Sequence, residues 1–155
     1  MVVDMKRRCI SVGKHRGHLR DLAHEVKNNR NAIYEAAKIM ASYVSKDKVL
    51  VPIPSHTGDA RYTYDIAYAI SILTGAKVVD ALQGFNRKSS HEAKLEGKSV
   101  KSKIWFFKPA DVELPDGNVV LIDNCIATGK TIEAARKALN MEAIALTITN
   151  ASIGN

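Results

Sequence analysis

The sequence predicts an α/β domain with a parallel sheet and flanking helices. Short apolar runs that are typical of strands alternate along the chain with stretches in which apolar residues recur every three or four positions, as in amphipathic helices. One run, Val119–Ile122, is apolar at every position, which indicates a strand buried on both faces of the sheet. Because strands that alternate with helices form right-handed βαβ units, the sheet is expected to be parallel.

The expected elements follow in chain order. Short apolar runs predict strands at residues 8–12, 48–53, 77–82, 104–107, 119–122 and 143–148. Periodic apolar residues predict helices near residues 19–27, 33–44, 66–73 and 132–139. The first strand is expected at an edge of the sheet, ended by Gly13, and Asn31 is expected to cap the second helix. Gly75 is expected to end the third helix.

Length and composition predict one soluble domain that covers residues 1–155. The chain is 46% hydrophobic and 25% charged, and no apolar run approaches the roughly 20 residues of a membrane span. The first residues lack the apolar centre of a signal peptide. Cys9 and Cys125 are the only cysteines and lack the spacing of metal ligands, so a cytoplasmic location is expected. Cys125 is interpreted as a small filler residue, although a helix dipole could lower its pKa.

The net charge of +7 is concentrated at one end of the chain. Residues 1–20 hold six Lys or Arg side chains against Asp4 alone, so this segment carries +5 and the rest of the chain only +2. A basic terminal segment can bind nucleic acid, but the uneven distribution argues against a binding groove along the whole domain. The nearby His15, His18 and His24 lack the cysteine or carboxylate partners of a zinc site and are interpreted as surface residues.

The central candidate for a binding site follows the strand at residues 119–122. Asp123 and Asn124 come first, at the point where the strand would leave the sheet. The next residues are small or carry donors, and they lead into a helix: Ala127, Thr128, Gly129, Lys130 and Thr131. The first amides of a helix have no internal partners and carry the positive end of its dipole, so they bind phosphate. Asp123 would repel a phosphate, so we expect it to face hydroxyls or a hydrated cation.

Two nucleotide-binding motifs can be compared with this stretch. A P-loop requires glycine five residues before the glycine of Gly-Lys-Thr, and that position is occupied by Asn124. The stretch instead resembles the signature of the type I phosphoribosyltransferases, in which an apolar strand, two acidic residues and a Thr-Gly-rich loop follow one another. In that family the loop holds the 5′-phosphate of phosphoribosyl diphosphate and the acidic pair contacts the ribose hydroxyls. The present chain departs from the pattern at the second acid, which is Asn124.

The resemblance implies a second anion site. In the family, the turn after an earlier strand holds the diphosphate, and here that turn consists of Ser55, His56, Thr57 and Gly58. Both turns would lie at the carboxyl ends of parallel strands, where ligands bind in such sheets. The alternative is that residues 55–58 only close a βα unit.

Residues 83–103 are polar and rich in cations. Type I transferases have a flexible loop in the corresponding place, which implies that Arg87 and Lys88 bring positive charge to the leaving diphosphate when the loop closes. The alternative is a solvated loop without a role in catalysis. The chain also resembles the late-competence (ComF-type) branch of the family, in the order and spacing of three segments: residues 17–22, 51–54 and 84–103. The arginine-rich turn of that branch is represented here only by Arg61.

The resemblance implies a phosphoribosyltransferase that uses Mg²⁺ and displaces diphosphate with a nitrogen nucleophile, a base or an amine. Asp123 would stabilise the cationic sugar and meet the metal through ribose hydroxyls or water. The resemblance also implies a homo-oligomer. The alternative is a noncatalytic sensor of the same ligand, which Asn124 and the basic N-terminal segment favour, whereas the cationic loop favours the enzyme. A plain nucleic-acid-binding domain is a third and weaker interpretation.

Overall fold

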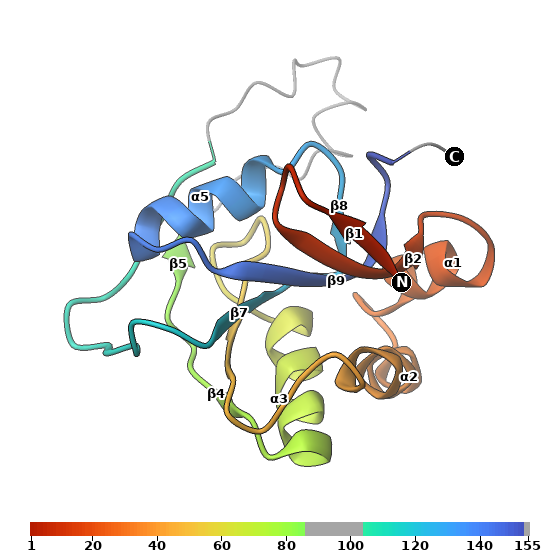
Figure 1. Cartoon of the computed structure of the whole chain (residues 1–155), viewed down its shortest axis with the longest axis horizontal. Coiled ribbons are helices and arrows are strands. Elements are labelled where there is room, and N and C mark those ends of the chain that lie inside the picture. Colours follow the sequence, from red (N-terminus) through yellow and green to blue (C-terminus); the bar gives the residue numbers. More distant parts are fainter. Residues whose placement is uncertain (86–103, 154–155) are drawn as a thin grey trace.

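The computed structural model describes residues 1–85 and 104–153, which form a mixed α/β structure around a mostly parallel sheet (Figure 1). In spatial order the strands are β1 (Val2–Asp4), β2 (Cys9–Lys14), β9 (Ile144–Asn150), β7 (Val119–Ile122), β3 (Val49–Pro52) and β4 (Lys77–Val78). Within this sheet β1 is antiparallel to β2, and the other pairs are parallel. The expected α/β class is therefore confirmed at this level.

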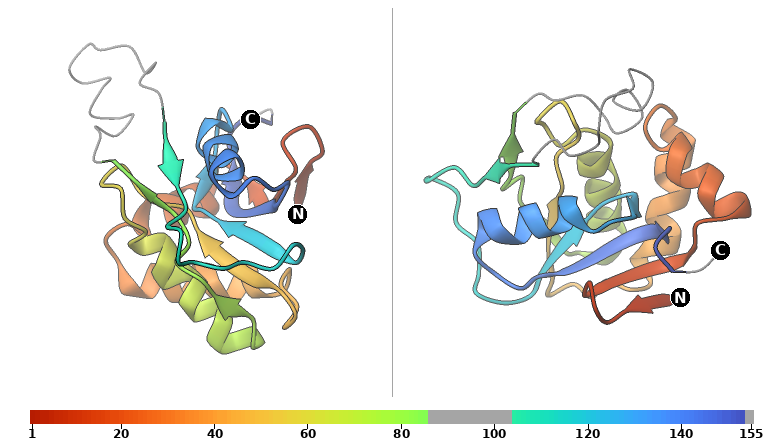
Figure 2. Two further views of the ribbon diagram at one scale, coloured as in Figure 1. Left: turned by 90° about the vertical axis from the view of Figure 1, so that its left-hand side faces the viewer. Right: turned by 90° about the horizontal axis from the view of Figure 1, so that it is seen from above.

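Helices cover both faces of the sheet. The helices in the described part of the chain are α1 (Gly17–Glu25), α2 (Arg30–Ala41), α3 (Tyr62–Thr74) and α5 (Lys130–Leu139). Helices α1, α2 and α3 pack on one face, and α5 packs on the other (Figure 2). None of these helices combines the length and apolar character needed to cross a bilayer.

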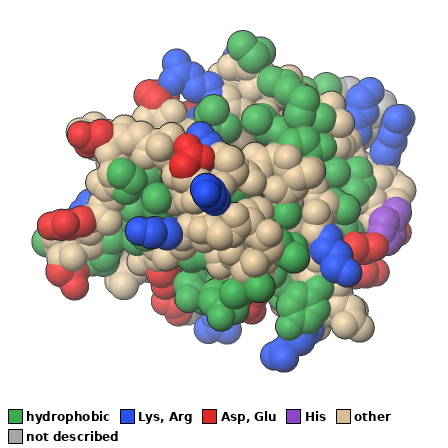
Figure 3. Space-filling model, turned by 60° about the horizontal axis from the view of Figure 1, so that its bottom comes forward, with side chains coloured by type: hydrophobic (Ala, Val, Ile, Leu, Met, Phe, Trp, Pro, Cys, Tyr) green, Lys and Arg blue, Asp and Glu red, His purple; other side chains and the backbone are tan. Residues whose placement is uncertain are grey.

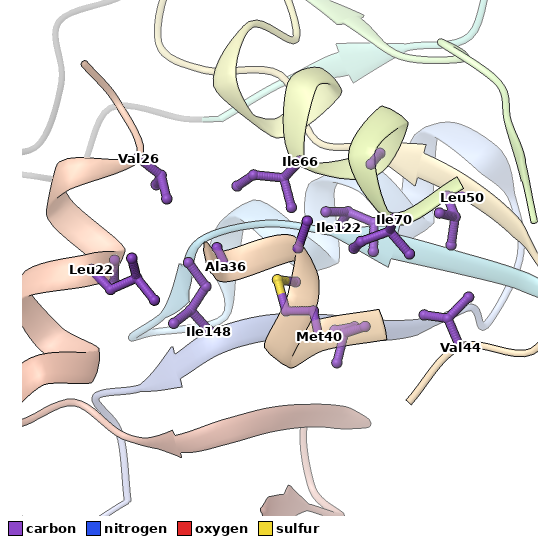
Figure 4. Close-up of a cluster of buried hydrophobic side chains, with 14 of the residues drawn as sticks. Leu22, Val26, Ala36, Met40, Val44, Leu50, Ile66, Ile70, Ile122 and Ile148 are labelled. Atoms are coloured by element: carbon purple, nitrogen blue, oxygen red, sulfur yellow. The ribbon is translucent and has the colours of Figure 1, made fainter. Parts of the chain in front are cut away.

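The two hydrophobic cores follow from the alternation of side chains along the strands. Leu50 and Ile122 point to the face of α1–α3, whereas their neighbours Val51 and Leu121 point to the face of α5. On the first face, helix residues such as Met40 pack against these strand residues (Figure 4). On the second face, α5 buries one side, as its periodicity predicts, through Ile132, Ala135 and Leu139.

Local sequence rules predict some helix ends and miss others. Helix α3 ends at Gly75, whose left-handed backbone at φ 83° confirms the prediction. The predicted cap of α2 is wrong by two residues, because the side chain of Asn29, not Asn31, accepts a hydrogen bond from the Ala32 amide at 3.2 Å. The final strand β9 begins at Ile144, one residue later than expected, and continues two residues beyond the expected end to Asn150.

Two strand predictions are wrong in detail. The first predicted strand is not at the edge, because β1 pairs with β2 and covers it, and β2 continues through Gly13 to Lys14. The strand expected at residues 77–82 pairs in the main sheet only at Lys77–Val78. The chain then leaves that sheet and forms β5 (Gln83–Gly84), which pairs antiparallel with β6 (Phe106–Phe107) in a separate ribbon. Residues 104–107 were expected to form a strand of the parallel sheet, but in the described part of the chain β6 pairs only with β5 and lies outside the main sheet.

Helices α2 and α3 also leave part of their apolar surface exposed. A groove of about 580 Å³ lies between them and is bordered by the exposed residues Tyr34, Tyr68, Ile72 and Leu73. Figure 3, with the lower side of the molecule turned forward, shows hydrophobic groups among scattered charged side chains.

A buried carboxylate ties the first strand to the last one. Asp4 is only 5% exposed and accepts hydrogen bonds from the Arg7 backbone amide at 3.0 Å, the Asn150 amide group at 3.2 Å and the Ser152 hydroxyl at 3.4 Å. Burial works to raise the pKa of Asp4, but hydrogen bonds from the Arg7 backbone, Asn150 and the Arg7 guanidinium outweigh it and hold the pKa below its ordinary value of 3.8.

This shift predicts an acid-sensitive contribution to stability. A carboxylate with a lowered folded-state pKa stabilises the fold fully above its unfolded-state pKa, and the contribution is lost as pH falls through the folded-state value. We expect Asp4→Asn to be less stable than the wild type at pH 7 and to lose less stability between pH 5 and pH 2. Urea denaturation at several pH values measures the difference, with exposed Asp111→Asn as the control. Parallel pH profiles for Asp4→Asn and the wild type would contradict the prediction.

Candidate functional site

The two predicted phosphate-binding segments follow neighbouring parallel strands. Strands β3 and β7 pair in register, with Pro52 opposite Ile122, so both end at the same edge of the sheet. The Ile53 amide donates to the Ile122 carbonyl at 3.0 Å and extends this pairing. The turn at residues 55–58 and the loop at residues 123–131 consequently begin side by side.

Asp123 and Asn124 occupy an interruption in strand pairing along β9. Strand β7 pairs with the first part of β9, and β8 (Cys125–Ile126), which the sequence did not predict, pairs with its last part. Between them, the Asn124 carbonyl accepts hydrogen bonds from the amides of Ile148 and Thr149 at 3.0 and 3.3 Å. The backbone of both candidate residues is therefore fixed by the sheet on either side.

Asp123 is a nearly buried carboxylate, 8% exposed, at the end of β7. Its Oδ1 accepts a hydrogen bond from the Asn124 amide at 2.8 Å, and its own amide donates to the Leu146 carbonyl at 3.2 Å. These bonds fix Asp123 at the edge of the sheet where β3 and β7 end. A carboxylate in this place can accept hydrogen bonds from hydroxyls of a bound sugar.

The side chain of Asn124 has structural partners that the sequence did not indicate. Its Nδ2 donates to the carbonyl of Ala23 in α1 at 2.8 Å. Its Oδ1 accepts a hydrogen bond from the hydroxyl of Tyr62, the first residue of α3, at 3.4 Å. An aspartate could not donate the first of these bonds when ionised. These two bonds give a physical reason why position 124 holds an asparagine, whereas the type I phosphoribosyltransferases have an acid there.

The predicted phosphate loop leads directly into α5. Gly129 is the residue before the helix and has a left-handed backbone, φ 85°, which glycine adopts without strain. The hydroxyl of Thr128 accepts a hydrogen bond from the Lys130 amide at 3.3 Å. The first intrahelical bond runs from the Glu133 amide to the Gly129 carbonyl at 2.9 Å, so the Thr131 and Ile132 amides precede the helical bonding pattern.

The loop is open to solvent, as an anion site requires. Ala127, Thr128 and Lys130 are exposed, and Gly129 and Thr131 are half-buried. Glu133 is an opposing charge in the first turn of α5, but Arg136 binds it at 2.8 Å and offsets its charge. The arrangement is compatible with a phosphate at the start of α5.

The turn at residues 55–58 is hydrogen-bonded within itself. The Ser55 amide donates to the Asp59 carbonyl and the Gly58 amide to the Ser55 carbonyl, both at 3.0 Å. The hydroxyls of Ser55 and Thr57 are 2.8 Å apart, and the Thr57 amide donates to the Ser55 hydroxyl at 3.4 Å. His56 lies between them. In this conformation the turn offers fewer amide donors to a diphosphate than its sequence suggests.

Cys125 follows Asn124 but lacks the features of a nucleophile. Burial raises the pKa of the Cys125 thiol, and the nearby charge of Asp123 acts in the same direction. The pKa is therefore not lowered, as a helix dipole could have lowered it. The thiol lies 3.7 Å from Nδ1 of His15, whose pKa is lowered by burial. His15 is half-buried and hydrogen-bonded to Thr149 at 2.9 Å, so its interpretation as a surface residue is wrong, whereas His18 and His24 are exposed as predicted.

The donor set for a cation is small. Within residues 1–85 and 104–153, no three His, Cys, Asp or Glu side chains are arranged to hold a metal ion. Mg²⁺ usually retains several waters and binds one or two carboxylates together with phosphate oxygens of a substrate. Asp123 fits that pattern as an indirect partner of a metal ion that binds together with a phosphorylated ligand. Arg87 and Lys88, the predicted cations of the flexible loop, lie outside the described residues.

One contact to the phosphate loop comes from the N-terminal segment. Arg7 lies in the turn between β1 and β2, and its Nε donates to the Thr128 carbonyl at 3.4 Å. The sequence indicates only that this segment is basic, because nothing local relates two residues 121 positions apart.

No model of a known protein family matches the sequence, and a search of curated proteins finds no significant match.

Proposed function

We propose that the protein binds phosphoribosyl diphosphate with Mg²⁺ and transfers its phosphoribosyl group to a nitrogenous base or amine. The observation that carries this proposal is that Asp123 lies at the edge where β3 and β7 both end and is followed in the chain by the Thr128–Thr131 loop, which leads into α5. The strand order β4-β3-β7-β9, parallel throughout, is compatible with the phosphoribosyltransferase-type fold that the sequence motif suggests. The assignment to that fold is part of the proposal.

Each segment has a distinct task in the proposed reaction. The amides at the start of α5 and the hydroxyl of Thr131 hold the 5′-phosphate. Asp123 accepts hydrogen bonds from the ribose hydroxyls, and its charge stabilises the sugar as it becomes positive in the transition state. Residues 55–58 face the diphosphate, which leaves with the electrons of the broken bond as the nitrogen nucleophile bonds to the anomeric carbon. Mg²⁺ bound with the substrate would neutralise part of the charge of the diphosphate. Holding the ribose and its phosphate in one orientation lowers the entropic cost of the displacement.

A noncatalytic sensor of the same ligand is the second candidate, and the bonds of Asn124 favour it. The position that would hold a second acid carries no charge, and its side chain binds α1 and α3. A ligand on Asp123 could therefore alter the packing of these helices through the adjacent residue.

Calorimetric titration with phosphoribosyl diphosphate, with and without Mg²⁺, tests both candidates. We expect binding that Mg²⁺ strengthens, because the metal offsets the repulsion between the diphosphate and Asp123. Release of diphosphate in the presence of a panel of bases and amines then identifies an enzyme, and binding without release identifies a sensor. If the protein does not bind phosphoribosyl diphosphate at millimolar concentration, both the transferase and the sensor are excluded.

Two hydroxyl variants test the assignment of the two anion sites. We expect Thr131→Val to weaken both ribose 5-phosphate and phosphoribosyl diphosphate by about 10-fold, because it removes a hydrogen bond to a charged group without changing the side-chain shape. Thr57→Val should weaken only phosphoribosyl diphosphate, since ribose 5-phosphate has no diphosphate to meet that turn. Calorimetry with both ligands measures the pattern. Equal effects of Thr57→Val on the two ligands would show that residues 55–58 do not bind the diphosphate.

A further inference from the structure

The hairpin of β1 and β2 approaches the start of α5. The two strands pair with Asp4 opposite Cys9, which leaves a short turn that contains Lys6 and Arg7. Figures 1 and 2 show this turn beside the loop that enters α5. A small hollow of about 190 Å³ lies between them, bordered by Lys6, Arg7 and residues of the loop and helix.

The Arg7 side chain is held against one side of the loop. Its Nε donates to the Thr128 carbonyl at 3.4 Å, and its Nη1 binds Asp4 Oδ2 at 3.3 Å. A Cβ added to Gly129 would come within 3.2 Å of Arg7 Cδ, so the arginine covers this side of the glycine. The side chain is only 30% exposed. Arg7 is therefore part of the packed structure, unlike an ordinary surface arginine.

Asp4 makes the position of the guanidinium specific. The carboxylate also accepts hydrogen bonds from Asn150 and Ser152, at the end of β9 and just beyond it. Because Asp4 is anchored to the sheet in this way, it fixes the orientation of Arg7. A lysine could supply the same charge, but a single ammonium group does not have the planar set of donors with which Arg7 reaches Asp4 and Thr128 together.

The geometry of the peptide bond gives this contact a consequence for the loop. The chain has no cis peptide bonds among the residues described, so the Thr128 carbonyl and the Gly129 N–H point in opposite directions across a planar bond. The carbonyl points towards Arg7. The Gly129 N–H consequently points to the opposite side of the loop, away from the arginine.

We propose that Arg7 is a positioning residue that orients the Thr128–Gly129 peptide, so that the Gly129 N–H is presented to a phosphate. The proposal rests on the proposed function only in placing a phosphate at this loop. It gives a specific role to part of the basic N-terminal segment. Without the guanidinium, the peptide can rotate and direct its carbonyl oxygen towards the anion, which would oppose binding.

Nuclear magnetic resonance of protein labelled with ¹⁵N-glycine tests the proposal directly, because the chain has only nine glycines. Inorganic phosphate and ribose 5-phosphate are titrated separately into the wild type and into Arg7→Ala, Arg7→Lys and Lys6→Ala. We expect the Gly129 amide of the wild type to shift with either ligand. In Arg7→Ala the same resonance should be displaced before any ligand is added, and affinity for both ligands should fall about 10-fold. Unchanged resonances of the other glycines show that the variant remains folded.

The two control variants separate position from charge. Arg7→Lys retains the charge, so we expect its affinity to remain several-fold below that of the wild type. Lys6→Ala removes a cation from the same turn and should cost less affinity than Arg7→Ala. Full affinity in Arg7→Lys, equal losses in Arg7→Ala and Lys6→Ala, or an undisplaced Gly129 resonance in Arg7→Ala would overturn the proposal.

The proposed function can fail separately. A wild type that binds inorganic phosphate in an Arg7-dependent manner but ignores phosphoribosyl diphosphate would sustain the role of Arg7 and exclude the transferase and the sensor. Conversely, Arg7→Ala with wild-type affinity for phosphoribosyl diphosphate would overturn the role of Arg7 alone. Failure of the wild type to bind any of these phosphates would overturn both.

Discussion

Gly58→Ala is expected to lower the free energy of unfolding by about 3 kcal/mol, through backbone strain and a steric clash together. Gly58 has φ +93°, a conformation that side chains other than glycine rarely adopt. A Cβ at this position would lie 2.4 Å from the Gly84 carbonyl oxygen and 3.0 Å from its carbon. Because both are backbone atoms of β5, no side chain can rotate to relieve the clash. The hydrogen bond from the Gly84 amide to the Gly58 carbonyl, now 2.9 Å, would also be strained.

Two other glycines provide matched controls for this substitution. Gly17 also has a positive φ, +59°, but a Cβ there would meet nothing within 4 Å, so Gly17→Ala measures conformational strain alone. Gly117 has open space around it as well and lacks a positive φ, so Gly117→Ala should be nearly neutral. Urea denaturation compares the three variants. If Gly58→Ala costs no more than Gly17→Ala, the contact between the 55–58 turn and β5 does not constrain the fold.

Features set by neighbouring residues were predictable from the sequence. The helical period around Ile132, Ala135 and Leu139 reports which side of α5 is buried, because a helix places these residues on one stripe. Gly75 ends α3 because glycine adopts the left-handed conformation at low cost. The apolar run Val119–Ile122 likewise required a buried strand, and β7 lies between β3 and β9.

Features set by partners distant in the chain were not predictable. Strand β8 consists of only Cys125 and Ile126, which have no distinctive pattern and form a strand because the end of β9 lies beside them. The edge position of β1 depends on pairing that its three residues do not specify. In the candidate site, Asp123 and the glycine loop could be identified from the sequence because a strand, an acid and a helix start occur in succession. The partners of Asn124 and Arg7 could not, because these contacts join segments 101 and 121 positions apart.

Asn124→Asp is the substitution that tests the most unusual position of the candidate site, and at pH 7 we expect it to cost about 2–3 kcal/mol of folding free energy. The ionised carboxylate cannot donate to the Ala23 carbonyl, which would lose a partner now 2.8 Å away. It would also place a second negative charge beside the nearly buried Asp123. The resemblance to phosphoribosyltransferases alone would suggest that an acid here assists catalysis, whereas the structure predicts that the loss of stability comes first.

The cost of Asn124→Asp should depend on pH with a definite sign. Both the neighbouring carboxylate and the Ala23 carbonyl favour the protonated form of the new side chain, so its pKa in the folded state should exceed the unfolded value of about 3.9. Between these two values the folded state binds more protons than the unfolded state, and stability therefore falls as pH rises. We expect the deficit to be small near pH 4, where a protonated carboxyl can donate to Ala23, and complete at pH 7. Asn124→Ala, which loses the same hydrogen bond without adding charge, should show a deficit that does not change with pH. If Asn124→Asp matches the stability of the wild type at pH 7, the bond to α1 does not hold this side chain in solution, and Asn124 is then available to a ribose hydroxyl as the resemblance implies.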